Sequence, residues 1–196
     1  MIVALTYRAF YNEISKSTNG GMDMFRQCTR LMICSAFVFT VAACSNNVDT
    51  KISKGFESAD QVFEQKPKTS TASTEHLQFY LPKDFTIKSS SDETNILLKK
   101  GDETFSLFIN PHEPKQSKQF YKAIQQKEKD AIVKEQTYEK DGQFGFASVL
   151  EDDNHNYRVV AGTGGVKITG VSGQQNIDHT IPELMEIAHS VQIKNK

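Results

Sequence analysis

The stretch VKEQTYEKDGQFGFASVLED, residues 133–152, decides the fold of this chain. Asp141 and Gly142 stand between two runs that contain aromatic and β-branched residues. An Asp-Gly pair in that setting is the strongest short-range signal for a tight β-hairpin, because both positions of the turn need positive φ. The stretch therefore predicts two antiparallel strands joined at Asp141-Gly142.

Turn signals of the same kind recur on both sides of this hairpin. Gly101-Asp102 separates two apolar runs within residues 97–111, and Thr163 to Gly165 separates two more within residues 157–172. Further short runs rich in aromatic and branched residues are HLQFYLP (76–82), DFTIKSS (84–90) and NILLKK (95–100). Consecutive hairpins of this kind predict an antiparallel sheet.

Two segments have helical spacing instead. In the first, Ser117 is a candidate cap, and the apolar residues that share one face are Phe120, Ile124 and Ala131. In the second, Thr180 and Glu183 have the spacing of a capping box, with Pro182 tolerated in the first turn. An apolar stripe follows there, formed by Ile181, Leu184, Met185, Ala188 and Val191.

The order of elements is about four strands, a helix, four strands and a helix. Since two one-sided helices must bury their apolar faces against a sheet, the predicted fold class is α+β, an antiparallel sheet of about 6–8 strands covered by two helices. We assign this domain to residues 76–196. The element order, with a strand pair leading into IPELMEIAHSVQI (181–193), resembles the PsbP-like α/β/α fold. It also resembles small uncharacterised lipoproteins of Gram-positive bacteria. A fold of this kind implies no particular activity.

The most apolar run of the chain indicates where the protein is located. Leu31 to Ala43 is uncharged and follows Arg26 and Arg30. The run is shorter than the roughly 20 residues that a membrane-spanning helix needs. A basic region, a short apolar region and small residues in that order are typical of a secretory signal, here residues 24–43.

The signal ends in Val41-Ala42-Ala43-Cys44, which resembles the lipobox of bacterial lipoproteins. The resemblance implies cleavage between Ala43 and Cys44 and acylation of the Cys44 thiol. The alternative interpretation is a buried core helix that contains Cys44. Residues 1–23 resemble neither a signal nor a folded element, and the codons of Gly20-Gly21 could hold a ribosome-binding sequence. We therefore expect translation to start at Met24.

Residues 44–75 are rich in Ser, Thr, Lys, Asp and Gln and end in KPKTSTASTE (66–75). This composition predicts a flexible tether between the lipid and the domain. The alternative is a short helix over 53–64, with Phe56, Val62 and Phe63 on one side.

Charge and cysteine content limit the function. The chain has 24 acidic and 23 basic residues. Two of the acidic and four of the basic residues precede Cys44, so the part from Cys44 onward carries a net charge of −3. Arg158 is its only arginine. This balance argues against a nucleic-acid partner. The three cysteines are Cys28, Cys34 and Cys44, so the exported domain would keep no free thiol and no disulfide.

No motif for catalysis, metal or cofactor binding has the required spacing. His179 and His189 are ten residues apart, too far to share one metal, and we interpret the histidines as surface residues: His76, His112, His155, His179 and His189. An acidic turn offers oxygen ligands without the calcium-loop spacing, and its low-ranking metal candidates are Glu151, Asp152, Asp153 and His155. No cofactor is predicted.

Aromatic residues alternate along the predicted strands. They are candidates for core packing or for the lining of an apolar ligand pocket: Phe79, Tyr80, Phe85, Phe105, Phe108, Phe144 and Phe146.

The favoured function is a non-enzymatic, lipid-anchored module that binds or assists another envelope component. The alternatives are a carrier of a hydrophobic small molecule between sheet and helix, and an enzyme.

Overall fold

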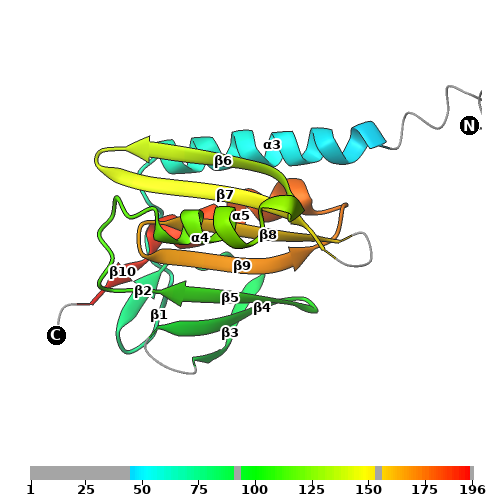
Figure 1. Cartoon of the computed structure of the whole chain (residues 1–196). Helices are drawn as coiled ribbons and strands as arrows, with labels where there is room; N and C mark the ends of the chain where they lie inside the picture. Colours follow the sequence, from blue (N-terminus) through cyan, green and yellow to red (C-terminus); the bar gives the residue numbers. More distant parts are fainter. Residues whose placement is uncertain (1–44, 91–93, 153–155, 195–196) are drawn as a thin grey trace, which may run out of the picture. The chain divides into compact units, whose positions relative to one another are not determined.

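The structure is a computed structural model that describes residues 45–90, 94–152 and 156–194. A seven-stranded antiparallel sheet forms its centre. Its strand order is β3-β4-β5-β9-β8-β7-β6, as Figure 1 shows. The strands are β3 (Phe85–Ser90), β4 (Asn95–Lys100), β5 (Glu103–Ile109), β6 (Ile132–Lys140), β7 (Gln143–Glu151), β8 (Tyr157–Thr163) and β9 (Val166–Ser172). Only β5 and β9 are neighbours in the sheet without being consecutive in the chain. The predicted α+β class is confirmed.

A smaller antiparallel sheet lies beside the main one. Its order is β1-β2-β10, and its strands are β1 (Ala72–Ser73), β2 (Leu77–Phe79) and β10 (Gln192–Ile193). The described residues also contain the helices α3 (Ser45–Glu64), α4 (Gln119–Lys127) and α5 (Ile177–Ser190), and the 3₁₀ turn η1 (Lys129–Ala131).

The three predicted hairpin turns are confirmed, and their backbone angles explain the residue choice. Asp141 and Gly142 have φ of 50° and 73°, Gly101 has φ of 57°, and Gly164 has φ of 53°. Positive φ is the conformation that favours glycine, with Asp and Asn next. The chain therefore reverses direction at the positions where the sequence supplies these residues.

Helices cover both faces of the main sheet. In Figure 1, α4 crosses in front of the sheet and α5 lies behind it. The larger core cluster joins α3 and α5 to one face, through residues such as Phe105, Ile168 and Leu184. The smaller cluster joins Ile124 of α4 to Phe146 and other side chains of the opposite face. Alternate side chains of each strand point to opposite faces, so both clusters come from the same strands.

Helix α3 is the main difference from the predicted organisation. Residues 45–64, which we expected in a flexible tether, form a helix that belongs to the folded unit beginning at Asn46. Its apolar residues recur at helical spacing, and all are at most 1% exposed: Ile52, Phe56, Ala59 and Phe63. The helix is stable because this stripe is buried against the domain, which outweighs a polar composition. The open alternative, a helix over 53–64, is the one that the structure supports.

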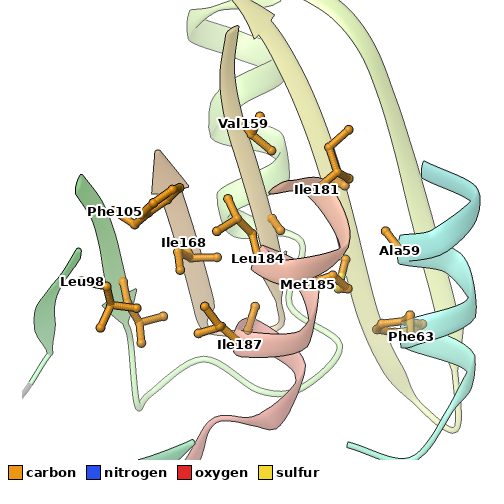
Figure 2. Close-up of a cluster of buried hydrophobic side chains, with 14 of the residues drawn as sticks. Ala59, Phe63, Leu98, Phe105, Val159, Ile168, Ile181, Leu184, Met185 and Ile187 are labelled. Atoms are coloured by element: carbon orange, nitrogen blue, oxygen red, sulfur yellow. The ribbon is translucent and has the colours of Figure 1, made fainter. Parts of the chain in front are cut away.

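Two glycines bring α3 close to its neighbours. A Cβ at Gly55 would lie 2.7 Å from Cδ1 of Ile181 in α5, and a Cβ at Gly145 in β7 would overlap the ring of Phe63. Glycine at both positions lets the backbones approach. Figure 2 shows Ala59 and Phe63 of α3 in the same buried cluster as Ile181, Leu184 and Met185 of α5.

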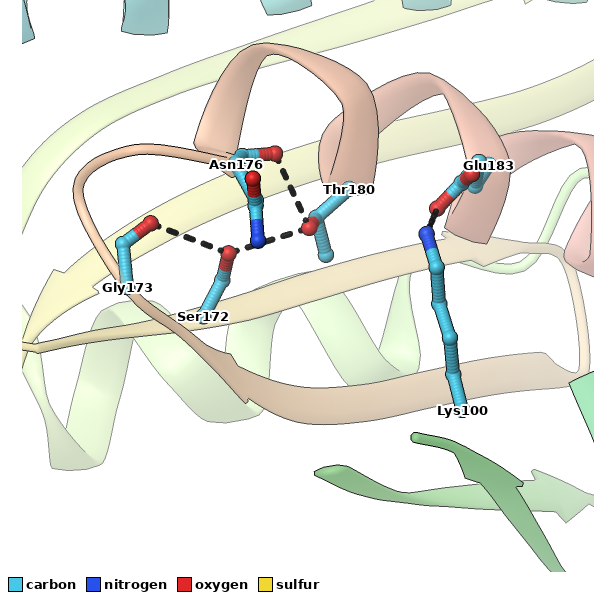
Figure 3. Close-up of polar contacts among 6 residues, drawn as sticks. All are labelled: Lys100, Ser172, Gly173, Asn176, Thr180 and Glu183. Atoms are coloured by element: carbon cyan, nitrogen blue, oxygen red, sulfur yellow. Dashed lines mark hydrogen bonds and ion pairs between the residues drawn. The ribbon is translucent and has the colours of Figure 1, made fainter. Parts of the chain in front are cut away.

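Helix α5 begins one turn before the predicted capping box. Ile177 is its first residue and is fully buried, so packing extends the helix beyond the local signal. The hydroxyl of Thr180 donates to the carbonyl of Asn176 at 3.1 Å and lies 3.0 Å from the hydroxyl of Ser172, as Figure 3 shows. Glu183 pairs with Lys100 of β4 at 2.5 Å instead of closing a capping box. The predicted role of Thr180 and Glu183 is therefore wrong.

The predicted apolar stripe of α5 is confirmed for Ile181, Leu184, Met185 and Ala188, which are each at most 1% exposed. Val191, its predicted last member, lies just after the end of the helix and is partly buried. In α4, the Ser117 hydroxyl accepts the Gln119 N–H at 3.2 Å and so contributes to the start of the helix, although Lys118 occupies the N-cap position. Ala131 lies beyond the end of α4, in η1.

Candidate functional site

The two residues with a predicted modification, Ala43 and Cys44, lie outside the described residues. Among the metal candidates, Glu151 and Asp152 are exposed, while Asp153 and His155 are not described. Within residues 45–90, 94–152 and 156–194, no group of three or more His, Cys, Asp or Glu side chains is placed to hold a metal ion. None of the helices in these ranges is long and apolar enough to cross a membrane.

The aromatic residues are mostly packed. Phe79, Phe85 and Phe105 lie in the larger core cluster, and Phe144 and Phe146 in the smaller one, each at most 3% exposed. Phe108 contacts Phe120 of α4 edge-on, with ring centroids 5.6 Å apart. The ammonium group of Lys68 lies 4.6 Å from the Tyr80 ring. The buried phenylalanines thus fill the space between sheet and helices, where the carrier interpretation placed a ligand.

Three surface hollows instead meet at one end of the main sheet, and Gln143 lines all three. Their volumes are about 250, 480 and 360 Å³. We call this region the grooved end, and it is formed by residues 63–67 at the end of α3, the β6–β7 turn (140–143), the loop after β5 (109–118), the β8–β9 turn (163–166), His189 and residues 191–193. In Figure 1 the β6–β7 and β8–β9 turns lie at the same end of the sheet.

Backbone hydrogen bonds fix the loop after β5 across the grooved end. The N–H of Asn110 donates to the carbonyl of Gly165 at 2.7 Å, and the N–H of Phe144 donates to the carbonyl of Lys115 at 3.0 Å. A Cβ at Gly164 would lie 2.8 Å from that same carbonyl oxygen of Lys115. The walls of the hollows are therefore held by main-chain contacts that bring distant segments together.

The charged side chains of the grooved end have both signs. Lys118 pairs with Glu139 at 2.6 Å, and Lys140 pairs with Glu64 at 3.3 Å. Lys66, Lys115 and Asp141 also line the hollows and are exposed. Such a surface suits contact with a polar partner that carries both signs of charge better than it suits an apolar small molecule.

His189 is the exception to the predicted surface histidines. Its side chain lines the 250 Å³ hollow, yet the residue is only 8% exposed and stacks on Phe63 with ring centroids 5.1 Å apart. Burial lowers the pKa of His189 below its ordinary value of 6.5; a backbone hydrogen bond with Val62 opposes this shift, and the positive charge of Lys140 adds to it. His112 and His179 are exposed, in agreement with the prediction, whereas the side chain of His76 is only 19% exposed and His155 is not described.

The lowered pKa of His189 makes stability depend on pH. The folded state favours the neutral imidazole, and the unfolded chain takes up a proton near pH 6.5. The contribution of neutral His189 is therefore fully present above about pH 6.5 and is lost as the pH falls from there toward the pKa in the folded state. We expect the thermal midpoint to fall more steeply between pH 7.5 and 5 for the wild type than for His189→Phe.

The exposed His179 in the same helix supplies the control, since its side chain is 72% exposed. His179→Gln should keep the pH dependence of the wild type. Equal pH slopes for the wild type and His189→Phe would contradict the assignment of this dependence to His189.

No protein-family model matches the sequence, and no curated protein matches it significantly. Among solved structures, the chain is similar to the solution structure of cyanobacterial PsbP (CyanoP) from Synechocystis sp. PCC 6803. The identity is 12%, the match covers 65% of this chain and 98% of that chain, and the TM-score is 0.37. The likeness concerns the fold alone. This match is of the PsbP-like kind that the sequence suggested, and at this TM-score it carries no functional residue and no further argument to this chain.

Proposed function

We propose that the protein is a lipid-anchored, extracytoplasmic lipoprotein whose α+β domain binds or assists another component of the cell envelope without catalysing a reaction. The observation that carries the anchor is the order of signals in the sequence: Arg26 and Arg30, the apolar run to Ala43, and then Cys44 within Val41-Ala42-Ala43-Cys44. Acylation of this cysteine would hold the domain at the membrane without a spanning helix.

The grooved end supports the binding role. Segments that are far apart in the sequence meet there around Gln143, and their positions are fixed by backbone hydrogen bonds. Lys66, Lys115 and Asp141 project charges of both signs from this rigid frame. A rigid polar surface of this kind can recognise a macromolecular partner with little loss of conformational entropy on binding.

Cys44→Ala tests the anchor. Because one acyl chain gives only marginal membrane binding and two chains anchor stably, loss of the acylated residue should be nearly all-or-none. We expect the variant to incorporate no fatty-acid analogue and to accumulate as a form that keeps its signal or leaves the membrane fraction. Metabolic labelling followed by fractionation measures both effects.

Cys34→Ala is the matched control, because Cys34 lies within the predicted signal, and it should keep the label. Label retained by Cys44→Ala would exclude the site.

For the binding role, photo-crosslinkers at Lys66 and at Glu57, an exposed residue of α3 away from the hollows, are compared in the same membranes. Equal adducts from both positions would contradict a role of the grooved end.

A further inference from the structure

We infer that the bilayer contacts the domain at the end where α3 begins, so that the grooved end points away from the lipid. This inference rests on the proposed acylation of Cys44. The surface that would face the bilayer, called here the anchor end, consists of residues 47–51 near the start of α3 and the loop between β9 and α5 (Gly173–Asn176).

The first step is the length of the connection. Val48 packs partly buried against the core, and Ile52 is 1% exposed, so α3 is fixed to the domain within its first two turns. Val48 is the fourth residue after Cys44, and even a fully extended chain spans only about 14 Å over four residue steps. The lipid anchor is therefore attached directly to the folded domain, without the long tether that the sequence predicted.

The second step is the position of the loop Gly173–Asn176. The ammonium group of Lys51 donates to the carbonyl of Gln175 at 3.0 Å, and Lys54 pairs with Asp178 at 3.8 Å. These contacts place the loop beside the first turns of α3. Gln175 is exposed in this loop, and an amide side chain can form hydrogen bonds with lipid headgroups.

The third step is the direction of α3. A helix of 20 residues is about 30 Å long. Its last turn supplies Phe63 and Glu64 to one of the hollows, and Glu64 pairs with Lys140 beside the β6–β7 turn. One helix length therefore separates the anchor end from the grooved end, and Figure 1 shows α3 running along the sheet between the two ends.

The fourth step is the charge on the outer face of α3, which disfavours an orientation in which the helix lies flat on the bilayer. Asp49, Glu57 and Asp60 are exposed there and outnumber the one exposed ammonium group, that of Lys54, whereas the apolar stripe is buried inside the domain. Helices that lie in a membrane interface have the opposite design, with Lys and Arg on the polar face and a free apolar face. Anionic lipid headgroups attract Lys and Arg and repel these carboxylates. An orientation in which the start of α3 points toward the bilayer keeps these carboxylates away from the lipid.

A matched pair of glutamines allows a direct test. Gln175 lies at the anchor end and Gln65 just after α3 at the other end, and both are exposed. The full chain with Gln175→Cys or Gln65→Cys is purified from membranes, labelled with a thiol-reactive fluorophore and reconstituted in phosphatidylethanolamine–phosphatidylglycerol vesicles that carry a headgroup quencher. We expect the label at Gln175→Cys to lose most of its emission and the label at Gln65→Cys to lose little.

The outcomes separate the orientation from the anchor. If the protein sediments with the vesicles and both labels are quenched equally, or Gln65→Cys more strongly, the orientation is wrong and the anchor stands. If the protein does not sediment and neither label is quenched, the proposed lipoprotein itself is wrong, and the orientation with it.

A spacer variant tests the cause of the orientation. Ten Gly and Ser residues inserted between Ser45 and Asn46 have a root-mean-square reach of about 17 Å. This variant should still sediment with the vesicles, while the difference between the two labels decreases. An unchanged difference would show that the short connection does not set the orientation.

Discussion

Phe63→Ala is expected to lower the free energy of unfolding by about 3–5 kcal/mol, the usual cost of deleting a buried aromatic ring. The ring is 1% exposed and stacks between Tyr138 and His189, with centroid distances of 5.5 and 5.1 Å. Its loss leaves a cavity between α3, β6 and α5. Against a total stability of about 5–15 kcal/mol for a natural domain, this change could unfold a large part of the population. Urea denaturation followed by circular dichroism measures the effect.

Gly145 provides a second, independent check of this contact. A methyl group there would overlap the Phe63 ring, so Gly145→Ala alone should cost about 1–3 kcal/mol by overpacking. In the Phe63→Ala background the space is open, and the same substitution should cost much less. Additive costs in the double variant would contradict the contact. Gly173→Ala, where a Cβ meets nothing within 4 Å, is the glycine control, and Glu57→Ala is the surface control on α3.

Leu184→Ala is expected to lower the free energy of unfolding by about 2–5 kcal/mol, through the lost transfer energy and the remaining cavity. Leu184 is fully buried, and Figure 2 shows its side chain directed from α5 toward the sheet, in the cluster that contains Val159 and Ile168. The midpoint of urea denaturation should fall with an unchanged slope.

His179→Ala serves as the control for Leu184→Ala, because His179 belongs to the same helix and its side chain is 72% exposed. Its cost should stay within about 0.5 kcal/mol. An unchanged midpoint for Leu184→Ala would show that α5 contributes little to the core.

The main sheet was predictable because its signals are local. Each tight turn needs positive φ, and the chain supplies Gly101, Asp141-Gly142 and Gly164 where that conformation occurs. The stripe of α5 was equally clear, since its apolar residues recur at helical spacing over three turns. In both cases, neighbours in the sequence decide the structure.

Helix α3 was less clear, because its composition resembles that of a linker. The stripe of Ile52, Phe56, Ala59 and Phe63 has spacings of four, three and four residues, but polar residues and Gly55 surround it. Glycine within a helix costs about 1 kcal/mol relative to alanine. Only the close approach of Ile181 explains that glycine, and no local pattern reveals the approach.

His189 follows Met185 by four residues and Ile181 by eight, so helical spacing alone would have placed it on the buried face. We assigned it to the surface because the histidines lack metal-ligand spacing, but its imidazole is buried and stacks on Phe63 of another helix. The grooved end left no signal in the sequence, because its residues come from separate segments that meet only in the folded domain.

The pairing of β5 with β9 sets the order in which this domain can assemble. Every other neighbour in the main sheet is joined by a hairpin, whereas the partners in this pairing, from Ile109 and Val166 to Phe105 and Gly170, are 57 to 65 residues apart. Closing so long a loop costs more chain entropy than forming a hairpin, and topologies with distant pairings fold more slowly. We therefore expect the meander β6–β9 and the unit β3–β5 to form early, and their union along β5 and β9 to limit the folding rate. Until then, both of these strands expose an unpaired edge, so a chain that is still folding is most prone to mispair with another copy at this step.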